Sequence, residues 1–122
     1  MEWTNSFLPD EQVVVIKTSG IADGPGSLEM AKSIATTMQQ YKTSRCLIDH
    51  SALVAVAGNS SDIYYRPPAI SKTGIPSGVK IAELVKPEHK EHFGFLEFVC
   101  RENGFDFRVF EEREPAIKWL TK

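Results

Sequence analysis

The feature that most constrains the fold is the apolar run at residues 46–48 (Cys-Leu-Ile), which ends abruptly in Asp49, His50 and Ser51. A continuous apolar run is typical of a strand buried on both faces of a sheet. The small residues over 52–58 predict a loop, and residues 59–62 (Asn-Ser-Ser-Asp) are of the types that cap helices. One buried strand therefore leads through a loop to a helix start, at the sheet edge where α/β proteins usually place their sites.

Strand and helix patterns alternate along the rest of the chain. The sequence predicts strands at 3–8, 12–19, 79–85 and 105–110, in addition to the strand that starts at Arg45. It predicts helices at 27–41, 62–72, 87–103 and from 114 onward, with Ser27 as the first cap and a break in the second helix at Pro67. Residues 20–26 are expected to be a loop, because Gly24, Pro25 and Gly26 mark one.

This order, β-β-α-β-α-β-α-β-α, predicts an α/β fold with a mixed, mostly parallel five-stranded sheet. The first two strands are joined by a short turn at 8–11 and form an antiparallel hairpin. A chain of 122 residues is expected to form one domain over residues 1–122.

Composition excludes several functions. The net charge is −2 and Lys and Arg alternate with acids, so neither nucleic acid nor an anionic membrane surface is an expected partner. No apolar run approaches the ~18 residues of a membrane-spanning helix. The two cysteines, Cys46 and Cys100, lie in an apolar strand and on an apolar helix face, as reduced structural cysteines do, which favours a cytoplasmic location.

Four segments of the chain resemble the SpoIIAA-like group, which includes the STAS domains of anti-sigma-factor antagonists and the bacterial STAS/SEC14-type proteins. These are the strand end at 46–49, the strand at 79–82, the helix at 95–99 with Gly104, and residues 109–110 followed by 116–120. The resemblance covers nearly the whole chain. It implies a SpoIIAA-like (STAS) fold and a non-catalytic regulatory role in bacteria, without a cofactor.

In the antagonists of this family, a serine at the start of the helix after the central strand is phosphorylated, and the unmodified form binds an anti-sigma kinase. The family motif there is Asp-Ser-(Ser, Thr or Ala)-Gly. This chain has Asn59, Ser60, Ser61 and Asp62 at the matching positions, so Asn replaces the leading Asp and Asp replaces the Gly. The resemblance implies that these four residues bind a protein partner of the anti-sigma type or accept a phosphate.

A second hypothesis concerns aromatic residues. Tyr64 and Tyr65 precede the proline break, and together with Phe93 they could line a crevice over the sheet. The SEC14-type resemblance makes a small hydrophobic or lipid-like ligand an alternative function, with the chain as its carrier or sensor. The alternative use of these rings is to cover the seam between helix and sheet.

Catalysis and metal binding are weaker hypotheses. Asp49, His50 and Ser51 would serve a weak hydrolase, but consecutive residues of a strand alternate between its faces and cannot converge. His89 and His92 are three residues apart on a helix, and without a further His or Cys nearby we expect an exposed polar face there and no metal. The hairpin also leaves an edge strand through which a homodimer could form.

Overall fold

The computed structural model describes residues 1–58, 60–76 and 78–122, and the side chains of Ser60 and Ser61 lie outside the description. Within these residues one sheet has five strands in the order β1-β2-β3-β4-β5, which is also their order in the chain. The strands are β1 (Glu2–Leu8), β2 (Val13–Ala22), β3 (Arg45–Val56), β4 (Lys80–Leu84) and β5 (Asp106–Phe110). β1 and β2 are antiparallel, and the other neighbours are parallel. The predicted mixed, mostly parallel sheet with an N-terminal hairpin is confirmed.

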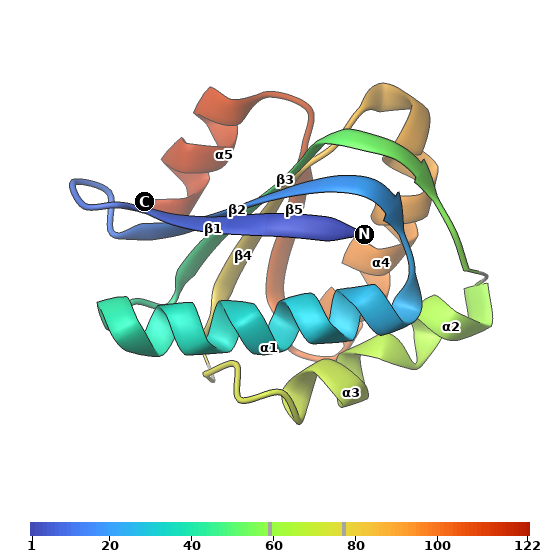
Figure 1. Ribbon diagram of the computed structural model, residues 1–122, viewed down its shortest axis with the longest axis horizontal. Coiled ribbons are helices and arrows are strands. Elements are labelled where there is room, and N and C mark those ends of the chain that lie inside the picture. The colour runs from blue at the N-terminus through green and yellow to red at the C-terminus, as the bar shows by residue number, and fades with distance from the viewer. Residues whose placement is uncertain (59, 77) are drawn as a thin grey trace.

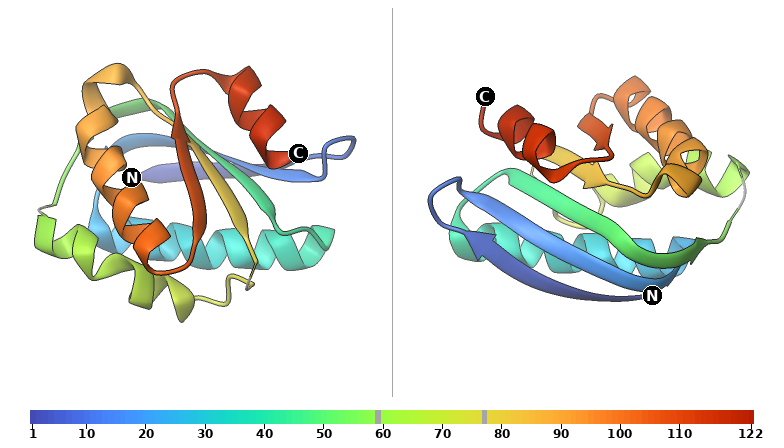
Figure 2. Two further views of the ribbon diagram at one scale, coloured as in Figure 1. Left: turned by 180° about the vertical axis from the view of Figure 1, so that it is seen from behind. Right: turned by 90° about the horizontal axis from the view of Figure 1, so that it is seen from above.

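Helices cover both faces of the sheet. They are α1 (Gly24–Tyr41), α2 (Ser60–Tyr64), α3 (Arg66–Ser71), α4 (Lys90–Glu102) and α5 (Arg113–Leu120), with a 3₁₀ turn, η1 (Pro87–His89), before α4. Figure 1 shows α1 and α5 on opposite sides of the strands. Seen from behind, α4 runs beside β5, and α2 and α3 lie at its lower end (left panel of Figure 2).

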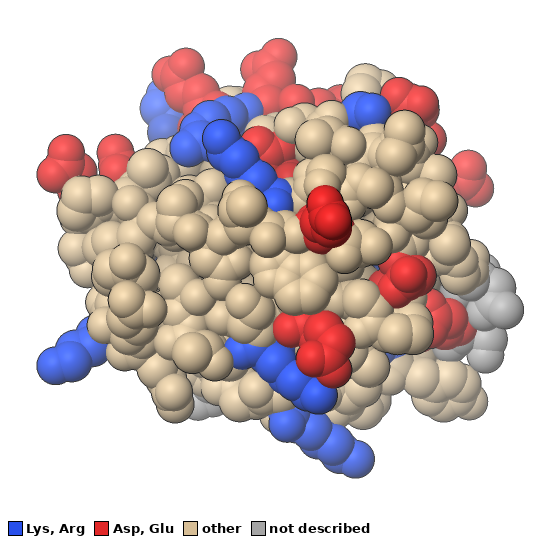
Figure 3. Space-filling model, viewed as in Figure 1, with Lys and Arg blue, Asp and Glu red and all other residues tan. Residues whose placement is uncertain are grey.

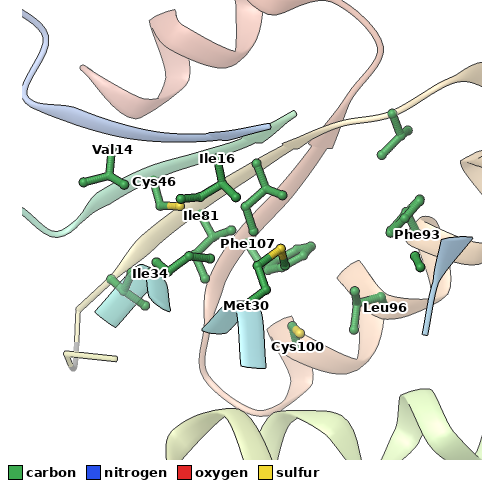
Figure 4. Close-up of a cluster of buried hydrophobic side chains, with 14 of the residues drawn as sticks. Val14, Ile16, Met30, Ile34, Cys46, Ile81, Phe93, Leu96, Cys100 and Phe107 are labelled. Carbon is green, nitrogen blue, oxygen red and sulfur yellow. The ribbon is translucent and has the colours of Figure 1, made fainter. Parts of the chain in front are cut away.

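Because successive side chains of a strand point to opposite faces of the sheet, the core consists of two clusters, one on each face. One cluster packs strand residues such as Val14, Ile16 and Ile81 against α1 and α4, and Figure 4 shows its main side chains. The other packs strand residues such as Leu47 against α5. The predicted buried strand is confirmed, because Cys46 and Leu47 have no exposed surface.

The prediction that the central strand ends before a loop at 52–58 was wrong, and so was the predicted end of β2 at Ser19. Both strands continue and pair with each other, with Ser19 opposite Ala52 and Ala22 opposite Val56. The register shifts twice along this stretch, and Gly20 takes a positive φ of 83°. Small residues such as alanine have a weak intrinsic preference for strands. Residues 52–56 form a strand here because they hydrogen-bond to residues 19–22 of the neighbouring strand.

The predicted start of the first long helix at Ser27 was also wrong. Asp23 is the N-cap, and its Oδ1 accepts a hydrogen bond of 2.6 Å from the backbone N–H of Gly26. Pro25 lies in the first turn, where its missing N–H has no helical partner to lose. The segment 24–26 that resembled a loop is therefore the first turn of α1.

The predicted break in the second helix is confirmed in outline. It lies at Tyr65, and α3 begins with Arg66, so that Pro67 falls in the first turn of a new helix. The chain also leaves α4 as predicted, through Gly104 at a φ of 86°.

Candidate functional site

The predicted docking residues lie where β3 leaves the sheet and α2 begins. Asn59 and the side chains of Ser60 and Ser61 are outside the described part of the structure, whereas the backbone of both serines forms the first residues of α2. Asp62 is exposed and accepts a hydrogen bond of 2.7 Å from the Arg66 guanidinium one turn later. The structure therefore locates the predicted segment at a helix start.

Asp62 is also fitted closely to two glycines. A Cβ on Gly24 would stand 2.7 Å from one Asp62 carboxylate oxygen, and a Cβ on Gly58 would stand 2.8 Å from the other. Because Gly24 begins α1, this places a negative charge at the positive end of the helix dipole. Asp62, which replaces the family's glycine, thus joins α2, α3 and the start of α1.

The three aromatic residues of the ligand hypothesis do not share a surface in the structure. Tyr64 and Tyr65 are 60% and 68% exposed, and their rings meet edge to face with centroids 5.3 Å apart. Phe93 is buried and stacks on the His50 ring at 4.6 Å. The tyrosines face outward, whereas Phe93 belongs to the core.

Asp49, His50 and Ser51 do not form a catalytic arrangement with one another. Ser51 donates both its backbone N–H, at 2.9 Å, and its hydroxyl, at 2.6 Å, to Asp49 Oδ1. His50 lies on the other face, where it is only 2% exposed. The alternation of the strand separates the serine from the histidine, as expected, and it buries the histidine in the core.

Sequence reasoning missed a buried polar chain that runs across three strands. His50 Nδ1 lies 2.7 Å from the Thr18 hydroxyl, and His50 Nε2 lies 3.1 Å from Glu83 Oε2. All three residues are buried, and Glu83 is 3% exposed. The signal was Glu83 itself, a charged residue between the apolar residues Ala82 and Leu84 of strand β4.

Glu83 has an oxygen without a partner. Its second carboxylate oxygen, Oε1, is buried and has no hydrogen-bond partner among the described residues. Leaving a buried acceptor unsatisfied costs about 1–3 kcal/mol, and more when the group is charged. Buried polar atoms of this kind call for an explanation in strain, function or a bound molecule.

Glu83 and His50 line a cavity of about 50 Å³ between the sheet and helices α1, α3 and α4. Most of its wall is apolar and includes Ile34, Ile81, Leu96 and Phe107. In Figure 4 these four side chains lie between the strands and the two long helices. The polar side chains Asp23, Arg66 and His92 also border the cavity.

His89 and His92 differ from the predicted exposed pair. His89 is buried, and its Nδ1 has no partner among the described residues. His92 meets the Phe93 ring edge-on, and burial, together with the nearby Arg66 charge, lowers the pKa of His92. In the part of the chain that the structure describes, no three His, Cys, Asp or Glu residues are grouped to hold a metal ion.

Both cysteines are free and buried. Burial raises the pKa of Cys46, and it raises the pKa of Cys100 to about 12, with the charge of Glu83 adding to both shifts. Neither thiol is therefore ionised at neutral pH, and neither has the thiolate character that reactivity requires.

Two surface properties bear on the choice of partner. Over the face shown in Figure 3, Lys and Arg side chains are scattered among acidic ones and form no continuous basic area. Across the described residues, the structure contains no helix with the length and apolar character needed to cross a lipid bilayer.

Comparison with known proteins places the fold. No protein-family model matches the chain, and no curated protein does. Among solved structures, it is similar to an uncharacterized protein of the DUF3478 family from Shewanella loihica PV-4, which has a SpoIIAA-like fold. The two share 18% sequence identity with a TM-score of 0.57, over 98% of this chain and 92% of the other. The chain therefore has a SpoIIAA-like fold, as its resemblance to STAS domains predicted.

Proposed function

We propose that this protein is a non-catalytic regulatory module that binds a protein partner through the docking segment, which we define as residues 54–65. The segment joins the end of β3 to α2, at the sheet edge where α/β proteins commonly place their sites. The resemblance to anti-sigma-factor antagonists supports the same location and a bacterial, cytoplasmic setting.

The observation that carries the proposal is the exposure of large apolar side chains in the docking segment. Val54 is 71% exposed, and with Tyr64 and Tyr65 it supplies three of the six large hydrophobic side chains exposed among the described residues. Tyrosine is enriched at interface hot spots because it combines a large contact area with a polar tip.

Buried residues anchor the docking segment to the core of the protein. Ile63, between the exposed positions, is buried in the larger core cluster, and Arg66 is buried while it binds Asp62. The exposed tyrosines therefore lie at the end of a short helix whose inner face is fixed in the core, Tyr64 as its last residue and Tyr65 directly after it. Such preorganisation favours binding because little conformational entropy is lost when the partner docks.

Ser60 and Ser61 give this surface a means of control. They open α2, where the resembling antagonists carry their phosphorylated serine. A phosphate there would lie within two residues of the Asp62 carboxylate, and repulsion between like charges would disturb the contacts of Asp62. We therefore propose that phosphorylation weakens partner binding.

The alternative functions receive less support. The cavity of about 50 Å³ is far below the ~300 Å³ at which ligand pockets usually begin, so a lipid-like molecule is too large for it. A larger surface groove of about 680 Å³ is lined by Tyr65, but by neither Tyr64 nor Phe93. A weak hydrolase at Asp49-His50-Ser51 would need the serine and histidine in contact, and they bind different groups. Binding of a partner therefore remains the favoured function.

The test compares the wild-type protein with one double variant and one single variant, each expressed in native cells of the source organism. Tyr64→Ser combined with Tyr65→Ser removes the exposed rings of the docking segment, whereas Phe98→Ser removes an equally exposed ring from α4. Quantitative affinity capture should recover a partner with the wild type and with Phe98→Ser but lose it, by tenfold or more, with the tyrosine variant. Equal recovery with all three proteins would refute the proposal.

A further inference from the structure

We propose that the cavity beside Glu83 binds a small organic cation, an ammonium group on a short hydrocarbon body, with the Glu83 carboxylate as its acceptor. The cavity lies under α3 and α1, on the inner side of the helices, whereas the docking segment exposes its side chains outward. Binding of a cation and docking of a protein partner can therefore be tested separately.

The first support is the unused oxygen of Glu83. Oε2 is engaged by His50 Nε2 at 3.1 Å, and Oε1 is buried without a partner among the described residues. Glu83 borders the cavity on the same face of β4 as Ile81, because residues two apart on a strand point the same way. A donor placed in the cavity would supply the hydrogen bond that Oε1 lacks.

The second support is that the other basic side chains bordering the cavity, Arg66 and His92, do not bind the Glu83 carboxylate. The Arg66 guanidinium is bound to the Asp62 carboxylate at 2.7 Å. His92 has its pKa lowered, chiefly by burial, and so is uncharged at neutral pH. Neither side chain binds Glu83 Oε1, which has no partner among the described residues.

His50 orients the Glu83 carboxylate by binding one of its two oxygens. The Thr18 hydroxyl lies 2.7 Å from His50 Nδ1 and 3.3 Å from the backbone oxygen of Asp49. We assign its hydrogen to the shorter contact, so Nδ1 accepts from Thr18 and Nε2–H donates to Glu83. His50 therefore holds Glu83 Oε2 and leaves Oε1 without a donor among the described residues.

The third support is size and shape. A volume of about 50 Å³ is roughly four times the ~10–15 Å³ that one water-sized sphere needs. The walls opposite Glu83 are hydrocarbon, from Ile34, Leu96 and Phe107 among others. A compact ammonium ion with about three carbons, about four non-hydrogen atoms in all, matches this volume, the carboxylate and the apolar wall.

The test uses n-propylammonium chloride, with n-propanol and sodium propionate as matched neutral and anionic probes of similar size. Titration into methyl-labelled protein at pH 7 and constant ionic strength should give saturable shifts of the Ile34, Ile81 and Leu96 methyl signals. We expect a dissociation constant on the order of 1 mM, as suits a ligand of so few atoms. Propanol should bind at least tenfold more weakly, and propionate should not bind.

Two variants test separately the contribution of the Glu83 carboxylate and that of the cavity volume to binding. Glu83→Gln keeps the shape but loses the charge, and Ala31→Leu fills part of the cavity while Glu83 remains. Both should weaken n-propylammonium binding at least tenfold, whereas Glu88→Gln, an exposed acid near α4, should leave it unchanged.

The proposal would be overturned if n-propylammonium gave no saturable shift up to 50 mM, which is on the order of fifty times the expected dissociation constant. It would also be overturned if n-propanol bound as tightly as n-propylammonium. A third contrary result would be n-propylammonium binding to Glu83→Gln as tightly as to the wild type. If either variant fails to fold, the three probes on the wild-type protein still decide the question. Loss of partner capture by the tyrosine variant has no bearing on these shifts.

Discussion

The two faces of the sheet are built in different ways. Under α5, the buried cluster consists of apolar side chains alone, among them Val15, Leu47, Ala116 and Leu120. Under α1 and α4, the core is larger, but it also encloses Thr18, His50 and Glu83 and a cavity. Among the described residues, the sheet thus has one face with a buried apolar cluster and one face that also buries polar groups.

Neighbouring residues of β4 show how the difference arises. Ala82 and Leu84 point toward α5, whereas Ile81 and Glu83 point toward α1 and α4. A face closed by hydrocarbon needs only shape complementarity, but a buried carboxylate must be met by donors. The α5 face therefore contributes stability through packing alone, whereas the α1 and α4 face buries a carboxylate oxygen that has no partner among the described residues.

The largest effect is expected from His50→Leu, on the polar face. This variant removes the only donor to Glu83 among the described residues and leaves a buried carboxylate without compensation. Removing one partner of a buried pair costs about 3–5 kcal/mol, so we expect a loss of that size in the free energy of unfolding. Urea unfolding at pH 7 measures it.

The matched control is the double variant His50→Leu with Glu83→Met, which replaces the pair with apolar groups of similar volume. Its stability should return to within about 1 kcal/mol of the wild type, because the desolvated charge is gone as well. If the double variant were as unstable as His50→Leu, the loss would be one of packing rather than of charge.

Leu47→Ala probes the apolar face and should have the next largest effect. Leu47 is completely buried under α5, and truncation of such a residue costs about 3 kcal/mol through lost burial and the cavity left behind. Unfolding in urea, with an unchanged slope, would show this loss. A cost below about 1 kcal/mol would mean that the α5 face is loosely packed, contrary to the comparison.

Asp23→Ala tests the contribution of the N-cap of α1, the helix that covers the face with buried polar groups. The variant removes the side chain that accepts from the Gly26 N–H, and loss of such a cap costs about 1 kcal/mol. Thermal unfolding followed by circular dichroism should show the corresponding fall in Tm. Asp23→Asn, which keeps an acceptor, should recover most of it, and equal loss in both variants would argue against capping.

The smallest effect concerns pH and His92. Its pKa in the folded protein lies below the ordinary value of 6.5, chiefly because of burial, so the unfolded chain binds the proton more readily. Stability should therefore fall as pH drops below about 6.5, toward the folded-state pKa. His92→Gln should make the change in Tm between pH 7.5 and pH 5 smaller, and an unchanged pH dependence would contradict this account.

Much of the sheet could be predicted from the sequence because each strand carries its own signal. Residues 46–48 and the β-branched run at 13–16 are strongly apolar, and both are buried strands. The ends of β2 and β3 could not be predicted, because residues 52–56 become a strand only by pairing with residues 19–22. Pairing of that kind is a property of tertiary structure and leaves no local pattern.

The site was only partly predictable for a similar reason. The location of the docking segment followed from the buried strand and the capping residues after it. The chain of Thr18, His50 and Glu83 did not, because it joins three strands that are at least 30 residues apart in sequence, with separations of 32 and 33. Only Glu83, as a charged residue within an apolar strand, marked that buried chain in advance.

The order of the strands in the sheet has a consequence for how the molecule is made. Because it matches their order in the chain, each strand that leaves the ribosome can join the edge formed by the strand before it. No strand has to wait for a later one to be inserted between itself and its neighbour. Assembly from the N-terminus during synthesis is therefore compatible with every strand pairing of the finished sheet.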